Sequence, residues 1–93
     1  MRVLVCGDRN YTDEEFLFSE LDDLHYRFDI RTIIEGEARG ADTLGRLWAE
    51  NWKIPVAAYP ADWEKYGKAA GSIRNTQMLK EGKPDLVMAF HKS

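Results

Sequence analysis

The sequence predicts an α/β protein, a Rossmann-like sandwich of three layers around a four-stranded parallel sheet. Four short apolar segments alternate with three segments of helical periodicity along the 93 residues. The connections are long enough for crossovers between parallel strands, and such crossovers are right-handed. Glycine-containing loops follow the first two apolar segments. The expected strand order is 3-2-1-4, which is half of a doubly wound fold.

The first half of the chain contains two of the expected strands and one helix. Residues 2–6 form an apolar run suited to a strand that is buried on both faces. A helix is expected to begin at Thr12, which we predict as its N-cap, with Glu15 completing a capping box. Its apolar face is formed by residues at helical spacing, Leu17, Leu21, Leu24 and Phe28. Residues 31–35 form the second expected strand.

The second half continues the alternation. A second helix is expected over residues 41–53, and its apolar side contains Leu44, Leu47, Trp48 and Trp52. A third strand is expected over 54–59, where Pro55 is tolerated because it lies at the start. Residues 60–67 are expected to form a polar and aromatic loop. A third helix over 69–81, ended by Gly82 and Pro84, leads to a fourth strand over 85–90.

Length and composition exclude several classes of protein. Residues 1–93 suffice for one small domain. No apolar run approaches the roughly 20 residues of a membrane span, and no signal peptide is expected. The single cysteine, Cys6, suits a reducing cytoplasm, and we expect it to be a small core residue. With a net charge of −3 and scattered basic residues, nucleic-acid binding is not expected. One cysteine and two histidines are too few for a zinc site, and neither a metal nor a cofactor is expected.

The strongest functional signal is the loop after the second strand. It joins an apolar run to a helix start, where unpaired backbone N–H groups can hold an anion. Gly36 and Gly40 would let the backbone approach a ligand closely, and Arg39 adds a planar cation suited to phosphate. The alternative is an ordinary turn with a surface arginine. The candidate ligand-binding residues of this loop are Gly36, Glu37, Ala38, Arg39, Gly40, Ala41 and Asp42.

Two other segments are expected at the same end of the sheet, where the ligand crevice of such folds lies. After the first strand come the candidates Gly7, Asp8, Arg9 and Tyr11, and from the region of the third helix come Trp63, Gly71, Arg74 and Asn75. Trp63 could stack on a base. Gly71 inside a helix costs roughly 1 kcal/mol relative to alanine, which requires a packing or proximity reason. The alternatives are a surface salt bridge for Arg9, core or dimer packing for Trp63, and a solvated Arg74.

Motifs of common phosphate chemistry are absent. The sequence has neither the full G-x-G-x-x-G fingerprint nor the G-x-x-x-x-G-K-[ST] loop. Glu35 and Asp42 are the carboxylates best placed for acid–base catalysis at a ribosyl bond.

Three segments together resemble a known family. They are Gly7-Asp8-Arg9, residues 35–42 (Glu-Gly-Glu-Ala-Arg-Gly-Ala-Asp), and the stretch from Pro60-Ala61-Asp62-Trp63 through Gly71-Ser72-Ile73-Arg74-Asn75. They resemble the YspA/YpsA-related branch of the SLOG superfamily, which occurs in bacteria and their phages, and the resemblance covers nearly the whole chain. It implies a Rossmann-like fold that binds nucleotides or nucleotide-derived ligands. Relatives include cytokinin-activating phosphoribohydrolases and DNA-processing protein A.

The leading functional hypothesis is a binding module for a small nucleotide or an ADP-ribose-like anion, acting as a sensor or a sink. The rival is a nucleoside-monophosphate phosphoribohydrolase or related N-glycosidase that uses Glu35 or Asp42. A third hypothesis is a structural or regulatory component without a small ligand. The resemblance favours binding over hydrolysis, because relatives usually continue into a second glycine loop and this sequence ends at Ser93, truncated relative to the family.

The resemblance and the composition also lead to expectations about assembly and location. A four-stranded half of a doubly wound fold leaves part of its sheet exposed, which favours a homo-oligomer. The expected location is the cytoplasm of a bacterium or of a phage-infected host cell.

Overall fold

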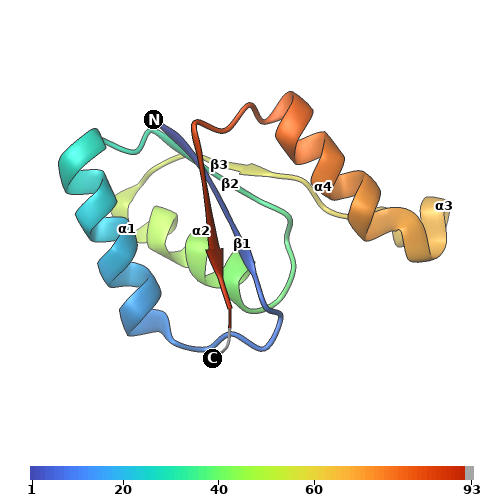
Figure 1. Ribbon diagram of the computed structural model, residues 1–93, viewed down its shortest axis with the longest axis horizontal. Coiled ribbons are helices and arrows are strands. Elements are labelled where there is room, and N and C mark those ends of the chain that lie inside the picture. The colour runs from blue at the N-terminus through green and yellow to red at the C-terminus, as the bar shows by residue number, and fades with distance from the viewer. Residues whose placement is uncertain (92–93) are drawn as a thin grey trace.

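A computed structural model describes residues 1–91 and places a parallel sheet at the centre of the molecule (Figure 1). The strands are β1 (Arg2–Gly7), β2 (Thr32–Glu35), β3 (Val56–Ala58) and β4 (Leu86–Phe90). Their order is β3-β2-β1-β4, and every neighbouring pair is parallel, which confirms the predicted topology. In this register Val3 of β1 lies beside Ile33 of β2 and Leu86 of β4.

The helices cover the two faces of the sheet unequally. Helices α1 (Glu14–Phe28) and α2 (Ala41–Trp52) lie on one face, and α4 (Ala70–Glu81) lies on the other (Figure 1). A short helix, α3 (Trp63–Tyr66), and a 3₁₀ turn, η1 (Gly67–Ala69), precede α4. Because side chains alternate along a strand, β1 and β2 contribute to both faces.

The larger part of the core lies under α1 and α2. Trp48 is packed there with Val3, Ile33 and the α1 leucines Leu17 and Leu21. A smaller cluster on the opposite face joins Leu4 and Ile34 of the sheet to Met78 of α4. The α4 side is therefore thinly covered, because that helix buries only Ala70, Arg74 and Met78.

Two of the predicted local structures are wrong in detail. The N-cap of α1 is Asp13 and not Thr12: the Asp13 Oδ1 accepts a hydrogen bond from the Phe16 amide at 3.1 Å. A capping oxygen must reach an amide of the first turn, and the carboxylate directly before Glu14 does so. The expected loop over 60–67 contains α3, because Asp62 caps it by accepting from the Lys65 amide at 3.1 Å.

The third strand is shorter than predicted, and the buried apolar faces of two helices are narrower than predicted. Strand β3 has three residues, flanked by Pro55 and Pro60, whose nitrogens cannot donate to a ladder. On α1, Phe28 is exposed, and on α2, Leu47 and Trp52 are exposed. Each helix lies against the sheet along one stripe, so residues at the margin of that stripe remain in solvent. No helix within residues 1–91 has the length and apolar character needed to cross a bilayer.

Candidate ligand-binding site

Two adjoining hollows lie where the strands end. The first has a volume of about 380 Å³ and is lined by Arg9, Gly36, Glu37, Ala38, Arg39, Pro60, Ala61, Trp63 and Arg74. The second has a volume of about 350 Å³ and is lined by Cys6, Gly7, Asp8, Arg9, Ala38, Asp42, Arg74, Asn75, Met78 and His91. Arg9, Ala38 and Arg74 line both, so these residues form the wall between them. The second hollow lies beyond β1 and β4, where the strand order predicts the crevice, whereas the first is lined mainly by residues that follow β2 and β3.

The loop between β2 and α2 is held in shape by Asp42. This side chain is 4% exposed, and its Oδ2 accepts hydrogen bonds from the amides of Gly36 at 2.9 Å and Ala38 at 3.3 Å. The Glu37 amide donates to the Glu35 carboxylate at 2.5 Å. The amides of residues 36–38 are therefore satisfied inside the protein. These three amides are not free to hold an anion, in contrast to what the sequence suggested for the start of this loop.

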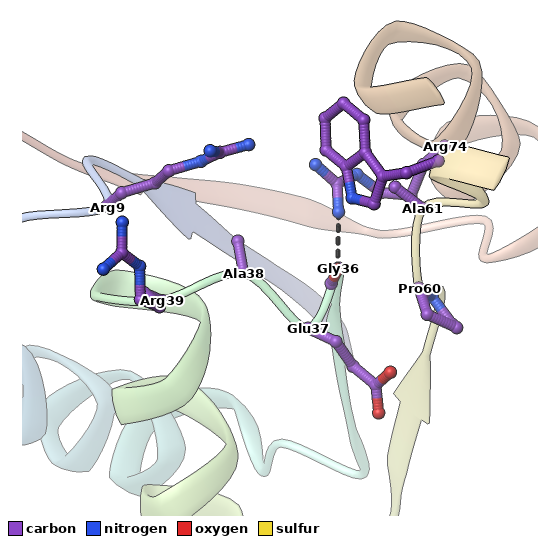
Figure 2. A pocket seen from close by; sticks show the side chains of 9 residues that line it. Arg9, Gly36, Glu37, Ala38, Arg39, Pro60, Ala61 and Arg74 are labelled. Carbon is purple, nitrogen blue, oxygen red and sulfur yellow. Dashed lines mark hydrogen bonds between the residues drawn. The ribbon is translucent and has the colours of Figure 1, made fainter. Parts of the chain in front are cut away.

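Arg74 joins α4 to the same loop. It is 9% exposed, and its Nη1 donates to the Gly36 carbonyl oxygen at 2.5 Å (Figure 2). Its Nε donates to the Asn75 Oδ1 at 2.9 Å. A Cβ on Gly36 would lie 2.6 Å from that Nη1, closer than Cβ atoms come to non-bonded atoms. A side chain at Gly36 would therefore displace Arg74, and Arg74 is a buried residue of the wall and not a solvated one.

The structure explains Gly40 by packing between two loops, whereas the sequence suggested close approach of a ligand. The φ of Gly40 is +77°, and a Cβ there would overlap the carbonyl oxygen of Asp8. The neighbouring Ala41 amide donates to that same oxygen at 3.3 Å. Gly40 and Ala41 therefore pack the β2–α2 loop against the loop after β1, and neither lines the two hollows.

Three guanidinium groups gather at the first hollow. Arg9 and Arg39 approach from one side and Arg74 from the other, whereas the carboxylate of Glu37 points away (Figure 2). Among residues 1–91, none of these three arginines forms an ion pair with a carboxylate. The Arg9 guanidinium lies 5.7 Å from the centroid of the Trp63 ring, and Trp63 is 50% exposed. The hollow thus combines unpaired positive charge with an accessible aromatic surface.

The two candidate acid–base residues differ in position. Asp42 lines the second hollow, and burial raises its pKa, although the amides of Gly36 and Ala38 and the charges of Arg74 and Arg9 act in the opposite direction. Glu35 is completely buried and lines neither hollow. Burial also raises the pKa of Glu35, and its Oε1 has no hydrogen-bond partner within the described structure.

The remaining predicted residues are divided between the site and its surroundings. Gly7, Asp8 and Asn75 line the second hollow. Tyr11 is placed in the core, with its ring centroid 5.6 Å from that of Phe90. Gly71 lines neither hollow, and a Cβ there would make an ordinary 3.6 Å contact with Trp63, so packing does not require glycine.

Five lining residues were not among the sequence candidates: Cys6, Pro60, Ala61, Met78 and His91. Cys6, Pro60 and His91 could have been found, because they lie at or just beyond strand ends. Met78 carries no such signal, because the rotation of α4 about its axis decides which of its residues face the sheet. Cys6 is only partly buried, and burial raises the pKa of its thiol. Within residues 1–91 no three histidine, cysteine, aspartate or glutamate side chains are grouped so that they could hold a metal ion.

Comparison with known families identifies the fold. The family model described as "YspA, cpYpsA-related SLOG family" matches residues 1–66. The chain belongs to the YspA, cpYpsA-related SLOG family. The match includes both glycine loops and α3, and Arg74 of this SLOG protein lies beyond it.

A phage protein is similar along nearly the whole length of this SLOG chain. The Gene 61 protein of Mycobacterium phage D29 is 36% identical over 95 residues, which cover 96% of this chain and 75% of the phage protein. No solved structure matches the sequence.

Proposed function

We propose that this SLOG protein binds a small nucleotide-derived anion of the ADP-ribose type in the two adjoining hollows. The observation that carries the proposal is the group formed by Arg9, Arg39 and Arg74, which lack carboxylate partners among residues 1–91. Guanidinium groups form two parallel hydrogen bonds with phosphate oxygens. The positive charge gathered here is best explained by an anionic ligand.

The shape of the site favours a ligand with groups on both sides of its phosphates. Arg9 and Arg74 line both hollows, so a diphosphate at this wall would lie between them. A base in the first hollow could stack on Trp63. In the second hollow, the Asp8 carboxylate can accept a hydrogen bond from a sugar hydroxyl group, and the Asn75 Nδ2 can donate one, because the Asn75 Oδ1 already accepts from Arg74. Each hollow is within the size range of small-molecule sites.

Binding without cleavage fits the carboxylates better than hydrolysis does. An acid–base residue must come within hydrogen-bond reach of the reacting bond. Glu35 lines neither hollow, and the Asp42 Oδ2 already accepts two amide hydrogen bonds. We therefore assign the protein a role in sensing or sequestering its ligand.

Titration calorimetry with ADP-ribose, AMP, ribose 5-phosphate and inorganic phosphate tests this proposal. ADP-ribose is expected to bind most tightly, because it alone has groups for both hollows. Trp63→Ala should weaken binding of ADP-ribose and AMP and leave ribose 5-phosphate unchanged. Arg27→Ala is the control, because Arg27 lies on α1 and pairs with Asp23 at 3.4 Å. If none of the four compounds binds, the proposal fails.

The hydrolase alternative is tested on the same mixtures by chromatography. We expect no free adenine from AMP or ADP-ribose above the level of a protein-free control. If the wild type releases adenine and Asp42→Asn does not, the function is N-glycosidic hydrolysis and not binding alone.

A further inference from the structure

The tip of the loop between β2 and α2 consists of Ala38 and Arg39, which belong to neither element (Figure 2). The residues that flank the tip both have positive φ, +57° at Glu37 and +77° at Gly40. The regular hydrogen bonds of a strand or a helix therefore do not fix the tip. Arg39 itself is exposed. The direction of its side chain depends on how the peptide unit before it is held.

Both backbone polar groups of Ala38 are held by successive side chains of α2. The Ala38 amide donates to the Asp42 Oδ2 at 3.3 Å, and the Ala38 carbonyl oxygen accepts from the Thr43 Oγ1 at 2.9 Å. The first bond is long, and the same Asp42 oxygen also accepts from the Gly36 amide. The second is the one hydrogen bond that the Ala38 carbonyl forms within residues 1–91. Thr43 therefore holds the peptide unit that joins Ala38 to Arg39.

The rigidity of this peptide unit transmits the restraint to Arg39. A trans peptide is planar, so its carbonyl oxygen, its amide and the next Cα move together. With the carbonyl held against α2, the Arg39 backbone keeps one orientation. The Arg39 guanidinium lies at the first hollow with those of Arg9 and Arg74 (Figure 2). Thr43 lines neither hollow, so its hydroxyl would act on a ligand indirectly.

We propose that Thr43 is a positioning residue of the ligand site, which keeps the Arg39 guanidinium directed at the anion. This inference rests on the proposed function, because it concerns the same ligand. A guanidinium forms two parallel hydrogen bonds with a phosphate only in the matching orientation. Without the hydroxyl the peptide unit can rotate, and Arg39 faces the hollow for only part of the time. The apparent affinity falls in proportion to that fraction.

Titration calorimetry with ADP-ribose tests the role of the hydroxyl. Thr43→Val has nearly the same shape without the hydroxyl and should weaken binding about two- to tenfold, the factor that corresponds to the net worth of one hydrogen bond. Thr43→Ser keeps the hydroxyl and should bind like the wild type. Thr76→Val is the matched control, because the Thr76 Oγ1 donates to the Ser72 carbonyl oxygen at 3.2 Å in α4 and lines neither hollow. The affinity of this control should be unchanged.

The same measurement in an Arg39→Ala background separates positioning from a general structural effect. There Thr43→Val should cause no further loss of affinity, because no guanidinium remains to be directed. A hydroxyl with a structural role alone would lower the melting temperature and leave the affinity, measured well below that temperature, unchanged.

Three results would overturn the inference while the proposed function stands. They are wild-type affinity in Thr43→Val, an equal loss of affinity with and without Arg39, and a Thr43→Ser protein that binds as weakly as Thr43→Val. Failure of the wild type to bind ADP-ribose is a different outcome, which would remove the proposed function and this inference with it.

Discussion

The guanidinium of Arg74 donates a hydrogen bond to the carbonyl oxygen of Gly36, a residue 38 positions earlier in the chain. This contact ties α4 to the loop that follows β2. It also places a positive charge in the wall shared by the two hollows. Since α4 buries only two other residues, Ala70 and Met78, the contact supports both the fold and the site.

Arg74→Ala is therefore expected to lower the free energy of unfolding by about 1.5–3 kcal/mol, the scale of a hydrogen bond to a charged group. The Gly36 carbonyl would lose its charged donor. Asn75→Ala is the matched comparison, because it removes the neighbouring acceptor and leaves the bond to Gly36 intact. Urea denaturation should show a smaller loss for Asn75→Ala. Equal losses would mean that the bond to Gly36 is not what stabilises α4.

Arg39 differs from Arg74 because it is exposed and donates no side-chain hydrogen bond within residues 1–91. Arg39→Ala should leave stability within about 0.5 kcal/mol of the wild type. The substitution should instead weaken the binding of ADP-ribose by about 1.5–3 kcal/mol, measured by calorimetry. Arg39→Lys should recover part of that loss, because lysine keeps the charge and loses the planar fork. Identical affinities for all three proteins would remove Arg39 from the site.

Gly40→Ala should destabilise the fold, because the added Cβ would meet the Asp8 carbonyl and the backbone has φ of +77°. A substitution at Gly67 distinguishes the steric clash from the strain of a positive φ. The φ of Gly67 is also positive, +56°, but a Cβ there would contact nothing within 4 Å. Gly67→Ala should cost about 1–3 kcal/mol from backbone strain alone, and Gly40→Ala should cost more. Thermal denaturation compares the two variants, and a Gly40→Ala protein as stable as Gly67→Ala would contradict the packing role.

Glu35 should make stability depend on pH. Burial raises its pKa in the folded protein above the ordinary value of 4.5, so folding favours the protonated form. Its contribution is fully present below pH 4.5 and is lost as the pH rises through the raised pKa. Relative to Glu35→Gln, the wild type should lose stability on going from pH 4.5 toward 7.5. The slope can reach about 1.4 kcal/mol per pH unit for one proton.

Urea denaturation at several pH values measures this difference. Glu35→Gln keeps an oxygen that can accept from the Glu37 amide, so the comparison isolates the charge. Glu64→Gln removes a charge from an exposed site of α3 and serves as the control. Parallel stability curves for the wild type and Glu35→Gln would show that the buried carboxyl does not titrate as described.

The fold could be predicted from the sequence because its determinants are local. Apolar runs indicated the four strands, and helical spacing indicated α1, α2 and α4 to within a few residues. The same reasoning placed Arg9, Arg39 and Trp63 near the crevice, since each follows a strand directly or by a short loop. The carboxyl ends of parallel strands lie at the same end of the sheet. The loops that follow the strands therefore lie near one another, whatever their sequences or conformations.

The roles of individual polar side chains were decided by tertiary structure. Glu35 and Asp42 were equivalent as acidic residues beside a glycine loop, but Glu35 is buried beneath it and Asp42 organises its amides. Tyr11 belongs to the core because it meets Phe90, which lies at the other end of the chain. Gly36 and Gly40 are glycines because of Arg74 and Asp8, which approach them from other elements. Periodicity specifies which face of an element is apolar, but the groups that meet a given atom across the fold are determined only when the elements pack together.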